Sequence, residues 1–307
     1  MESIIKYYQV AHVGFSLSYP DYCQEVMTTL LEAYQAFECD EQVVSAARTS
    51  FTLTLSESGE ELRKPAGFRE ECRQDEEGQL IISGSLGDTQ KAFLMAMTDM
   101  KSMLITDLDY QHSNLLVPAG VFSQKSAFGA IKSTIDTSLM LLYAMRSAGN
   151  DTLLFHSSTV VKEGKAYLFL GKSGTGKSTH SGLWLKHIAG TRLLNDDNPV
   201  VYVAPEGTLM VSGSPWSGKT PCYKNEEYPV GGIVQLRQAP ENKIRKQTVI
   251  EAYVSLKSSV SGKAWEKNIA DGQHHTIEKI IGGTRLYQLD SLPDAGAALL
   301  CCQTISQ

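Results

Sequence analysis

The sequence predicts an α/β protein of two domains, a smaller α+β domain followed by a larger domain built on a mixed sheet. Strand-like and helical runs alternate along most of the 307 residues. The pattern of the sequence changes near residue 123. We therefore place a domain boundary there, between residues 1–122 and 123–307. A glycine-rich stretch, residues 171–178, lies between a strand-like run and a helical run. These three observations carry the fold prediction.

The composition is typical of an ordinary globular protein. Hydrophobic residues make up 42% of the chain and charged residues 20%, enough for one large or two medium cores. The formal net charge of −6 gives no general electrostatic reason to expect nucleic acid or an anionic membrane as a partner. We find no signal peptide pattern and no apolar run of about 18 residues. We therefore expect a cytoplasmic protein. The six cysteines form no C-x-x-C pattern and indicate neither a zinc site nor a disulfide framework.

The N-terminal domain is expected to alternate short strands and helices. Residues 4–18 read as a strand, and a helix over residues 21–37 is predicted, with Asp21 as its N-cap. Residues 51–56 read as a second strand, and the charged segment 57–79 reads as a loop. Residues 80–84 favour a strand, and the methionine-rich run 89–105 favours a helix. No function is assigned to this domain.

The second domain opens with a helix over residues 126–150, followed by strands over residues 152–161 and 165–171. A helix is expected from Lys177 to near Gly190, and then a strand over residues 191–203. The latter strand should pair with residues 208–214 in an antiparallel hairpin. Strands over residues 231–238 and 284–289 and a closing helix over residues 293–305 complete the domain.

Residues 171–178, "GKSGTGKS", fit the phosphate-loop pattern G-x-x-x-x-G-K-[ST]. Glycines let backbone N–H groups curl around phosphate oxygens, and the following helix directs its positive end at the same anion. In this pattern Lys177 reaches the β- and γ-phosphates and the Ser178 hydroxyl binds Mg²⁺. The alternative is a glycine-rich turn with a surface lysine. We therefore expect ATP and Mg²⁺, with nucleotide contacts from Gly171, Ser173, Gly174, Thr175, Gly176, Lys177, Ser178 and Thr179.

Two adjacent acids, Asp196 and Asp197, follow about twenty residues after Lys177. A helix of about twelve residues covers roughly 18 Å, and a right-handed crossover then makes the next strand parallel to the first. The end of that strand should emerge beside the phosphate loop. Neighbouring side chains on a strand point to opposite faces, so one carboxylate can face the metal and the other an incoming hydroxyl. The alternative is that "NDDN" is a polar turn that caps a strand.

The segments "FHSSTVV", "GKSGTGKST" and "LLNDD" resemble the catalytic core of HPr kinase/phosphorylase and its relatives. The fold of that family is similar to the nucleotide domain of phosphoenolpyruvate carboxykinase, and the resemblance covers about residues 150–205 and, more loosely, the rest of the C-terminal half. It implies a phosphoenolpyruvate carboxykinase-like P-loop kinase domain in which Asp196 is the general base. It further implies that Asp197 helps to hold the metal and that His156 lies beside the carboxylates. The related kinases form oligomers, so a homo-oligomer is an expectation here.

One residue departs from the kinase pattern. Thr179 stands where HPr kinases commonly carry an acidic residue and carboxykinases a threonine, which weakens the expectation of a combined kinase and phosphorylase activity. Considered apart from the family resemblance, His156 is a lone histidine in an apolar strand. Such residues are more often core residues with satisfied hydrogen bonds than catalytic ones.

Two later segments are further candidates. The loop with Gly213, Trp216, Gly218 and Lys219 could close over a nucleotide or an acceptor. One or two of the basic residues Arg237, Lys243, Arg245 and Lys246 could neutralise charge on the transferred group.

The sequence thus predicts an ATP- and Mg²⁺-dependent phosphotransferase. Its acceptor would be a hydroxyl of a protein serine or of a small hydroxylated metabolite. One alternative is a carboxykinase-like enzyme that acts on oxaloacetate. Another is a nucleotide-sensing or scaffold protein that binds ATP without turnover.

Overall fold

The computed structural model describes residues 2–76, 78–98, 100–218, 220–262 and 266–306. The chain forms two compact units, Met1–Arg146 and Ser147–Gln307. The expected boundary after residue 122 therefore differs from the observed division. The cause is helix α3 (Phe128–Ser147), which packs with the N-terminal unit. The Tyr143 hydroxyl donates to the Val10 carbonyl at 3.0 Å, and Arg146 Nε donates to the Ser50 carbonyl at 3.1 Å.

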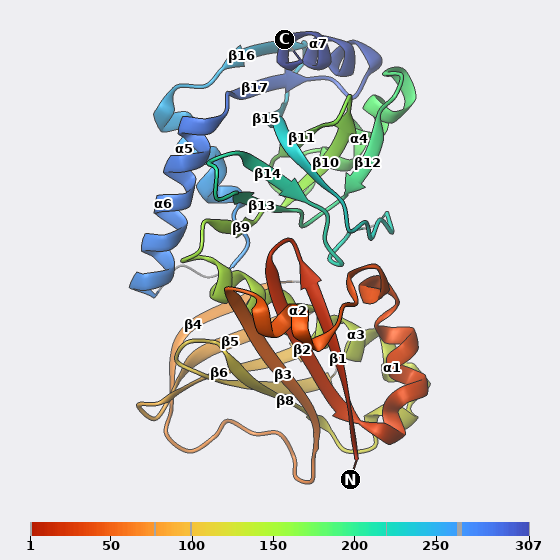
Figure 1. The fold of residues 1–307 in the computed structure, drawn as a ribbon, viewed down its shortest axis with the longest axis vertical. Coiled ribbons are helices and arrows are strands. Elements are labelled where there is room, and N and C mark those ends of the chain that lie inside the picture. The colour runs from red at the N-terminus through yellow and green to blue at the C-terminus, as the bar shows by residue number, and fades with distance from the viewer. Residues whose placement is uncertain (1, 77, 99, 219, 263–265, 307) are drawn as a thin grey trace. The chain divides into compact units, whose positions relative to one another are not determined.

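The N-terminal unit is built on an eight-stranded mixed sheet with the order β1-β2-β3-β8-β7-β6-β5-β4 (Figure 1). Strand β3 is parallel to both of its neighbours, and the other neighbouring pairs are antiparallel. The strands are β1 (Ser3–Val10), β2 (Val13–Pro20), β3 (Thr49–Ser58), β4 (Phe68–Glu76), β5 (Gln79–Leu86), β6 (Gln90–Met97), β7 (Met100–Asp107) and β8 (His112–Pro118). Short helices accompany them: η1 (Asp21–Cys23), α1 (Gln24–Leu30), η2 (Glu32–Phe37), α2 (Glu41–Ala46), η3 (Val121–Ser123) and η4 (Lys125–Ala127).

Several expectations for this unit are wrong. The strand expected over residues 4–18 is a hairpin of β1 and β2, which turns at Ala11 with a φ of 50°. The expected helix 21–37 is divided into η1, α1 and η2. The segment 57–79 is a loop only in part, because Phe68–Glu76 pairs with β5 as an edge strand.

The methionine-rich run 89–105 forms strands β6 and β7 and no helix. Methionine is a good helix former, but propensity is a weak signal that tertiary contacts override. Here both strands find partners on each side, β6 between β5 and β7, and β7 between β6 and β8. Pairing with the neighbouring strands therefore decides the structure of this segment.

The C-terminal unit is an α/β unit on a nine-stranded mixed sheet with the order β12-β10-β11-β15-β14-β13-β9, in which β17 also pairs with β15 and β16 pairs with β17. The strands are β9 (Thr152–Leu154), β10 (Ser157–Lys162), β11 (Lys165–Leu170), β12 (Arg192–Asn195), β13 (Val200–Val203), β14 (Leu209–Ser212), β15 (Glu227–Gln238), β16 (Lys243–Lys246) and β17 (Leu286–Ser291). The helices are α4 (Lys177–His187), α5 (Val249–Ser259), α6 (Lys267–Gly283) and α7 (Ala295–Ile305). The predicted hairpin of residues 191–203 and 208–214 is confirmed in β13 and β14, as is the closing helix.

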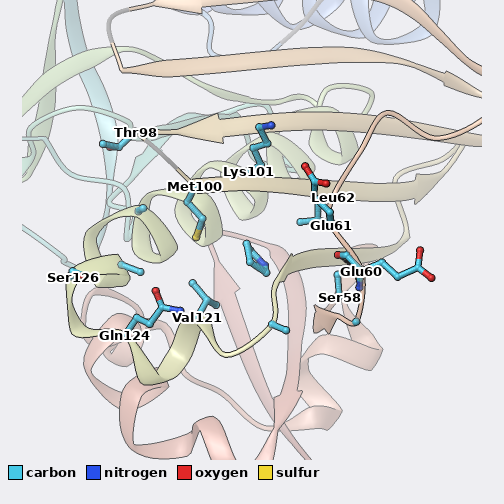
Figure 2. Close-up of a pocket in the computed structure, with 15 residues that line it drawn as sticks. Ser58, Glu60, Glu61, Leu62, Thr98, Met100, Lys101, Val121, Gln124 and Ser126 are labelled. Carbon is cyan, nitrogen blue, oxygen red and sulfur yellow. Dashed lines mark hydrogen bonds between the residues drawn. The ribbon is translucent and has the colours of Figure 1, made fainter.

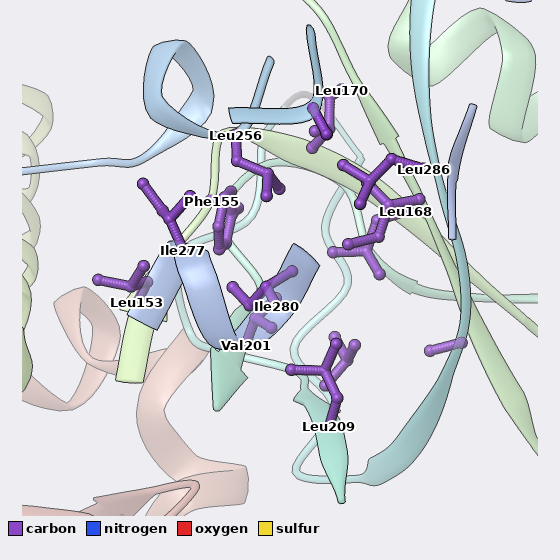
Figure 3. Close-up of a cluster of buried hydrophobic side chains, with 14 of the residues drawn as sticks. Leu153, Phe155, Leu168, Leu170, Val201, Leu209, Leu256, Ile277, Ile280 and Leu286 are labelled. Atoms are coloured by element: carbon purple, nitrogen blue, oxygen red, sulfur yellow. The ribbon is translucent and has the colours of Figure 1, made fainter. Parts of the chain in front are cut away.

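Alternating residues of β11 face two separate hydrophobic cores, because side chains along a strand point to opposite faces. Ala166, Leu168 and Leu170 lie in a cluster with residues of α5 and α6 (Figure 3). Tyr167 and Phe169 lie in the other cluster, with residues of α4 and α7. The strand that leads into the predicted phosphate loop is thus covered by helices on both faces.

Two expected strands are interrupted where the chain passes between parts of the sheet. The strand expected over residues 152–161 divides into β9, which pairs with β13, and β10, which pairs with β11 and β12. The strand expected over residues 191–203 divides into β12 and β13. Asp196 and Asp197 lie in the bend between β12 and β13. Within the described residues, no helix combines the length and the apolar character that crossing a membrane requires.

Candidate active site

The predicted phosphate loop connects β11 to α4. Gly174 and Gly176 adopt φ angles of 78° and 104°, a region in which glycine alone is unstrained. Gly176 is also the N-cap of α4, and among the described residues no side chain caps this helix. The first N–H groups of a helix lack partners within it, and they favour an anion. The loop therefore presents open backbone donors at the positive end of α4.

Lys177, the first residue of α4, turns back over this loop. Its ammonium group donates to the Gly171 carbonyl at 3.0 Å, and the side chain is largely buried. Burial lowers the pKa of Lys177, while the carboxylates of Asp197 and Asp196 raise it. Both acids therefore lie close enough to act on the charge of the loop lysine, as the sequence predicts.

A side-chain turn builds the bend that carries the two acids. Asn195, the last residue of β12, accepts through Oδ1 from the backbone N–H groups of Asp197 at 2.9 Å and Asn198 at 2.8 Å. Its amide group donates to Ser214 Oγ at 3.1 Å. Such Asx turns compete with strand geometry, which explains why the acids leave the strand. The expectation that they point to opposite faces of a strand is therefore wrong.

Asp196 is the more deeply buried acid, with 5% of its surface exposed. Its Oδ1 atom accepts a hydrogen bond from Ser158 Oγ at 2.7 Å. Its Oδ2 atom is buried and has no hydrogen-bond partner among the described residues. A buried carboxylate oxygen without a partner is costly in a folded protein, and it is the kind of atom that a ligand satisfies.

Asp197 lies in a different environment, with about a third of its side chain exposed. Its Oδ2 atom accepts from Asn198 Nδ2 at 2.8 Å, and its Oδ1 atom lies 3.7 Å from His156 Nδ1. Burial raises the pKa of Asp197, and the nearby Asp196 raises it further, while His156 and Lys177 lower it. His156 thus lies beside the Asp197 carboxylate.

The sheet brings these groups together by a route that differs from the predicted one. Strand β12 does not pair with β11, since β10 lies between them and is antiparallel to both. Strands β11 and β12 therefore run in the same direction, and their C-terminal ends open at one edge of the sheet. Strand β10 begins at that edge, directly after His156. The inserted strand also supplies Ser158, a residue that the motifs did not indicate.

Sequence reasoning missed the residues that hold the acids in place, which are Ser158, Ser181, Asn195 and Ser214. The run of three hydroxyl residues in "HSST", at the start of a largely buried strand, is the signal that could have found Ser158, because buried hydroxyls need partners.

The loop of residues 213–218 packs against the acid bend. A Cβ atom at Gly218 would lie 3.2 Å from Asp197 Cβ, so a larger residue would press on this carboxylate. Trp216 is buried, and its carbonyl accepts from the Asn198 N–H at 3.2 Å. Lys219 lies outside the described residues. The loop thus supports the bend, and its closure over a ligand stays a prediction.

Two cavities border the phosphate loop on its β15 side. One of about 390 Å³ is lined by Gly174, Gly176, Thr179 and Leu183 among others, and one of about 480 Å³ by Lys172, Ser173 and Arg237 among others. Gln238 lines both cavities, and its amide donates to the Gly174 carbonyl at 3.2 Å. Lys243, Arg245 and Lys246 lie on β16, and none of the three lines either cavity.

A larger cavity of about 700 Å³ lies in the N-terminal unit (Figure 2). Its lining side chains include Glu60, Lys101 and Gln124. Ser58 and Glu60, on its rim, already bond to each other through the Ser58 hydroxyl. The larger cavity is therefore not one of those that border the clustered reactive groups.

The residues of the site fit a magnesium-bound nucleotide. Among the described residues, no three His, Cys, Asp or Glu side chains are grouped to hold a metal by themselves. Mg²⁺ beside phosphates needs fewer protein ligands, because it takes one or two protein oxygens and completes its shell with phosphate and water. Ser178 is exposed in the first turn of α4, and Asp197 lies in the acid bend. The buried Asp196 oxygen, which has no partner among the described residues, also fits a magnesium-bound nucleotide.

Comparison with known proteins does not assign the chain to a family. No family model and no curated protein matches the chain. Among solved structures, the chain is similar to the HPr(Ser) kinase/phosphatase from Coxiella burnetii, with 15% sequence identity and a TM-score of 0.29. That similarity covers 48% of this chain and 90% of the other. A likeness at this level is no evidence of activity.

Proposed function

We propose that the C-terminal unit binds ATP with Mg²⁺ and transfers the γ-phosphoryl group to a hydroxyl group. The observation that carries this proposal is the buried Oδ2 atom of Asp196, which has no partner among the described residues and belongs to an acid that acts on the charge of Lys177. An acid with a free oxygen beside an anion-binding loop is suited to proton transfer at a phosphoryl centre.

The loop and α4 would bind the phosphates of ATP. The open N–H groups at the start of α4 and the left-handed glycines can surround phosphate oxygens without steric conflict. The Lys177 ammonium would exchange its bond with the Gly171 carbonyl for bonds to phosphate oxygens. Bound Mg²⁺ would neutralise phosphate charge, and Ser178 and Asp197 are the residues that would hold it.

Asp196 would accept the proton of the acceptor hydroxyl. In the proposed reaction the hydroxyl oxygen bonds to the γ-phosphorus, the bond from that phosphorus to the bridging oxygen breaks, and ADP leaves with the electron pair. The hydroxyl proton passes to Asp196 Oδ2. His156, 3.7 Å from Asp197, would adjust the charge of that second carboxylate. Positioning and charge neutralisation supply most of the rate enhancement in such reactions.

The acceptor class is tested with γ-labelled ATP. We expect label transfer to one member of a panel of free serine, other hydroxylated metabolites and small phosphocarrier proteins. Lys177→Ala should abolish transfer, while Asp196→Asn should bind nucleotide and lose transfer. Glu163→Gln is the control, because Glu163 is an exposed acid in the turn between β10 and β11. This turn joins the ends of the two strands that lie farther from the site. It should transfer at the wild-type rate.

Each of the other outcomes favours a different function. Transfer at the wild-type rate by Asp196→Asn would remove the base assignment. Formation of phosphoenolpyruvate from oxaloacetate, ATP and Mn²⁺ would favour the carboxykinase-like reaction. Tight ATP binding without turnover on any acceptor would favour a nucleotide sensor.

A further inference from the structure

A chain of two buried hydroxyl groups ends at the Asp196 carboxylate. Ser181 Oγ lies 2.5 Å from Ser158 Oγ, and Ser158 Oγ lies 2.7 Å from Asp196 Oδ1. The three side chains come from different elements, namely α4, β10 and the bend after β12. Their exposed fractions are 2% for Ser181, 0% for Ser158 and 5% for Asp196. Bulk water therefore does not compete for these hydrogen bonds.

The chemistry of the three groups sets the direction of this chain. An ionised carboxylate only accepts, so the Ser158 proton is directed at Asp196 Oδ1. A hydroxyl has one proton to donate, so Ser158 can only accept from Ser181. The order is thus Ser181 to Ser158 to Asp196, and each hydroxyl has a single orientation.

We propose that Ser158 and Ser181 are positioning residues that fix the Asp196 carboxylate, so that Oδ2 is the oxygen available to the acceptor hydroxyl. This inference rests on the proposed function, in which Asp196 Oδ2 accepts a proton. Bonding of Oδ1 prevents the carboxylate from turning, and Oδ2 keeps no partner among the described residues. Hydrogen bonds to an ionised group are about twice as strong as neutral ones, which suits them to this task.

The hydroxyl chain also links the acid to the phosphate loop. Ser181 lies four residues after Lys177, so both side chains lie on the same face of α4. The helix that presents the loop lysine thus also anchors the acid, through Ser158. A shift of α4 relative to β10 would therefore disturb both groups together.

The chain offers a matched control next to Ser158. Ser157 precedes it on β10 and is equally buried, but its hydroxyl lies 3.5 Å from Thr159 Oγ1 and, among the described residues, makes no hydrogen bond with either acid side chain. Its backbone N–H donates to the Asp197 carbonyl at 2.8 Å, a bond that Ser157→Ala keeps. Ser157→Ala and Ser158→Ala thus remove the same atom from adjacent buried sites.

The kinetic test compares Ser158→Ala, Ser181→Ala, the double variant and Ser157→Ala. We expect Ser158→Ala to lower kcat about tenfold with an unchanged KM for ATP, as for the loss of one hydrogen bond used in the transition state. Ser181→Ala should lower kcat less, about threefold, because it acts through Ser158. The double variant should match Ser158→Ala, because the effects of substitutions in one hydrogen-bonded chain of side chains are not additive. Additive effects, or an equal loss in Ser157→Ala, would overturn the inference.

A structural readout separates this inference from the proposed function. Crystal structures of the wild type and Ser158→Ala should show the Asp196 carboxylate turned from its wild-type orientation in the variant. An unmoved carboxylate would overturn the positioning role whatever the activity. A wild-type protein without phosphoryl transfer would contradict the proposed function, while the crystallographic comparison would still decide the role of Ser158.

Discussion

We expect His180 to make the unfolding free energy of the C-terminal unit fall as the pH is lowered. This residue of α4 is 4% exposed, and its Nε2 atom accepts from Trp184 Nε1 at 3.1 Å. Its ring packs edge-on against Phe169 with 4.7 Å between centroids. Burial lowers the pKa of His180 from 6.5 to about 4. A protonated ring would be charged in this core and would lose its bond from Trp184.

The sign follows from proton binding in the two states. Between about pH 6.5 and pH 4 the unfolded chain binds a proton at this residue and the folded chain does not, so acidification favours unfolding. The contribution is fully present above the unfolded pKa and is lost as the pH falls toward the folded pKa. A shift from 6.5 to about 4 at about 1.36 kcal/mol per pKa unit corresponds to roughly 3 kcal/mol. Domain stabilities are about 5–15 kcal/mol, so this loss is measurable.

The assay is urea unfolding at pH 7 and pH 4.5, without nucleotide or magnesium, followed by tryptophan fluorescence. All three tryptophans of the sequence lie after residue 146, so the signal reports on the C-terminal unit. The comparison is with His180→Gln, which does not titrate. Between these pH values the wild type should lose about 2 kcal/mol more of its unfolding free energy than the variant. Equal losses in the two proteins would show that His180 does not cause this pH dependence.

Further predictions concern the loop and the bend. Gly176→Ala places a side chain at a φ of 104° and should lower the unfolding free energy by about 1–2 kcal/mol and weaken ATP binding in calorimetry. Gly182→Ala on α4 meets open space, so it should leave binding unchanged; equal effects of the two would contradict the role of the loop conformation. Asn195→Ala removes the acceptor of the Asp197 and Asn198 N–H groups and should cost about 1–3 kcal/mol in chemical denaturation. An unchanged stability would show that other groups hold the bend.

Local signals were sufficient to locate the loop and the two acids that the structure brings together in the C-terminal unit. The glycine pattern between a strand and a helix predicted the loop. Gly174 and Gly176, which have left-handed backbone conformations, lie within this pattern. The acids lie near Lys177 as expected, since both raise its pKa. These features depend on residues close in sequence, for which spacing and backbone chemistry are informative.

Long-range pairing could not be predicted in the same way. Nothing local indicates that β10 inserts between β11 and β12, since that order depends on how the whole sheet assembles. The Asn195 turn was hidden because "NDDN" fits a strand end and a polar turn equally well. In the N-terminal unit, the run 89–105 has helix-forming residues whose strand pairing comes from distant partners.

The central claim is that the phosphate loop and the acid bend form one site. A crystal structure of the protein with Mg²⁺ and a non-hydrolysable ATP analogue tests it most directly. We expect a triphosphate enclosed by residues 171–178, with the terminal phosphate facing Asp196 Oδ2. A nucleotide bound elsewhere, or a terminal phosphate more than about 10 Å from both acids and so beyond coordination or hydrogen-bonding range, would contradict it.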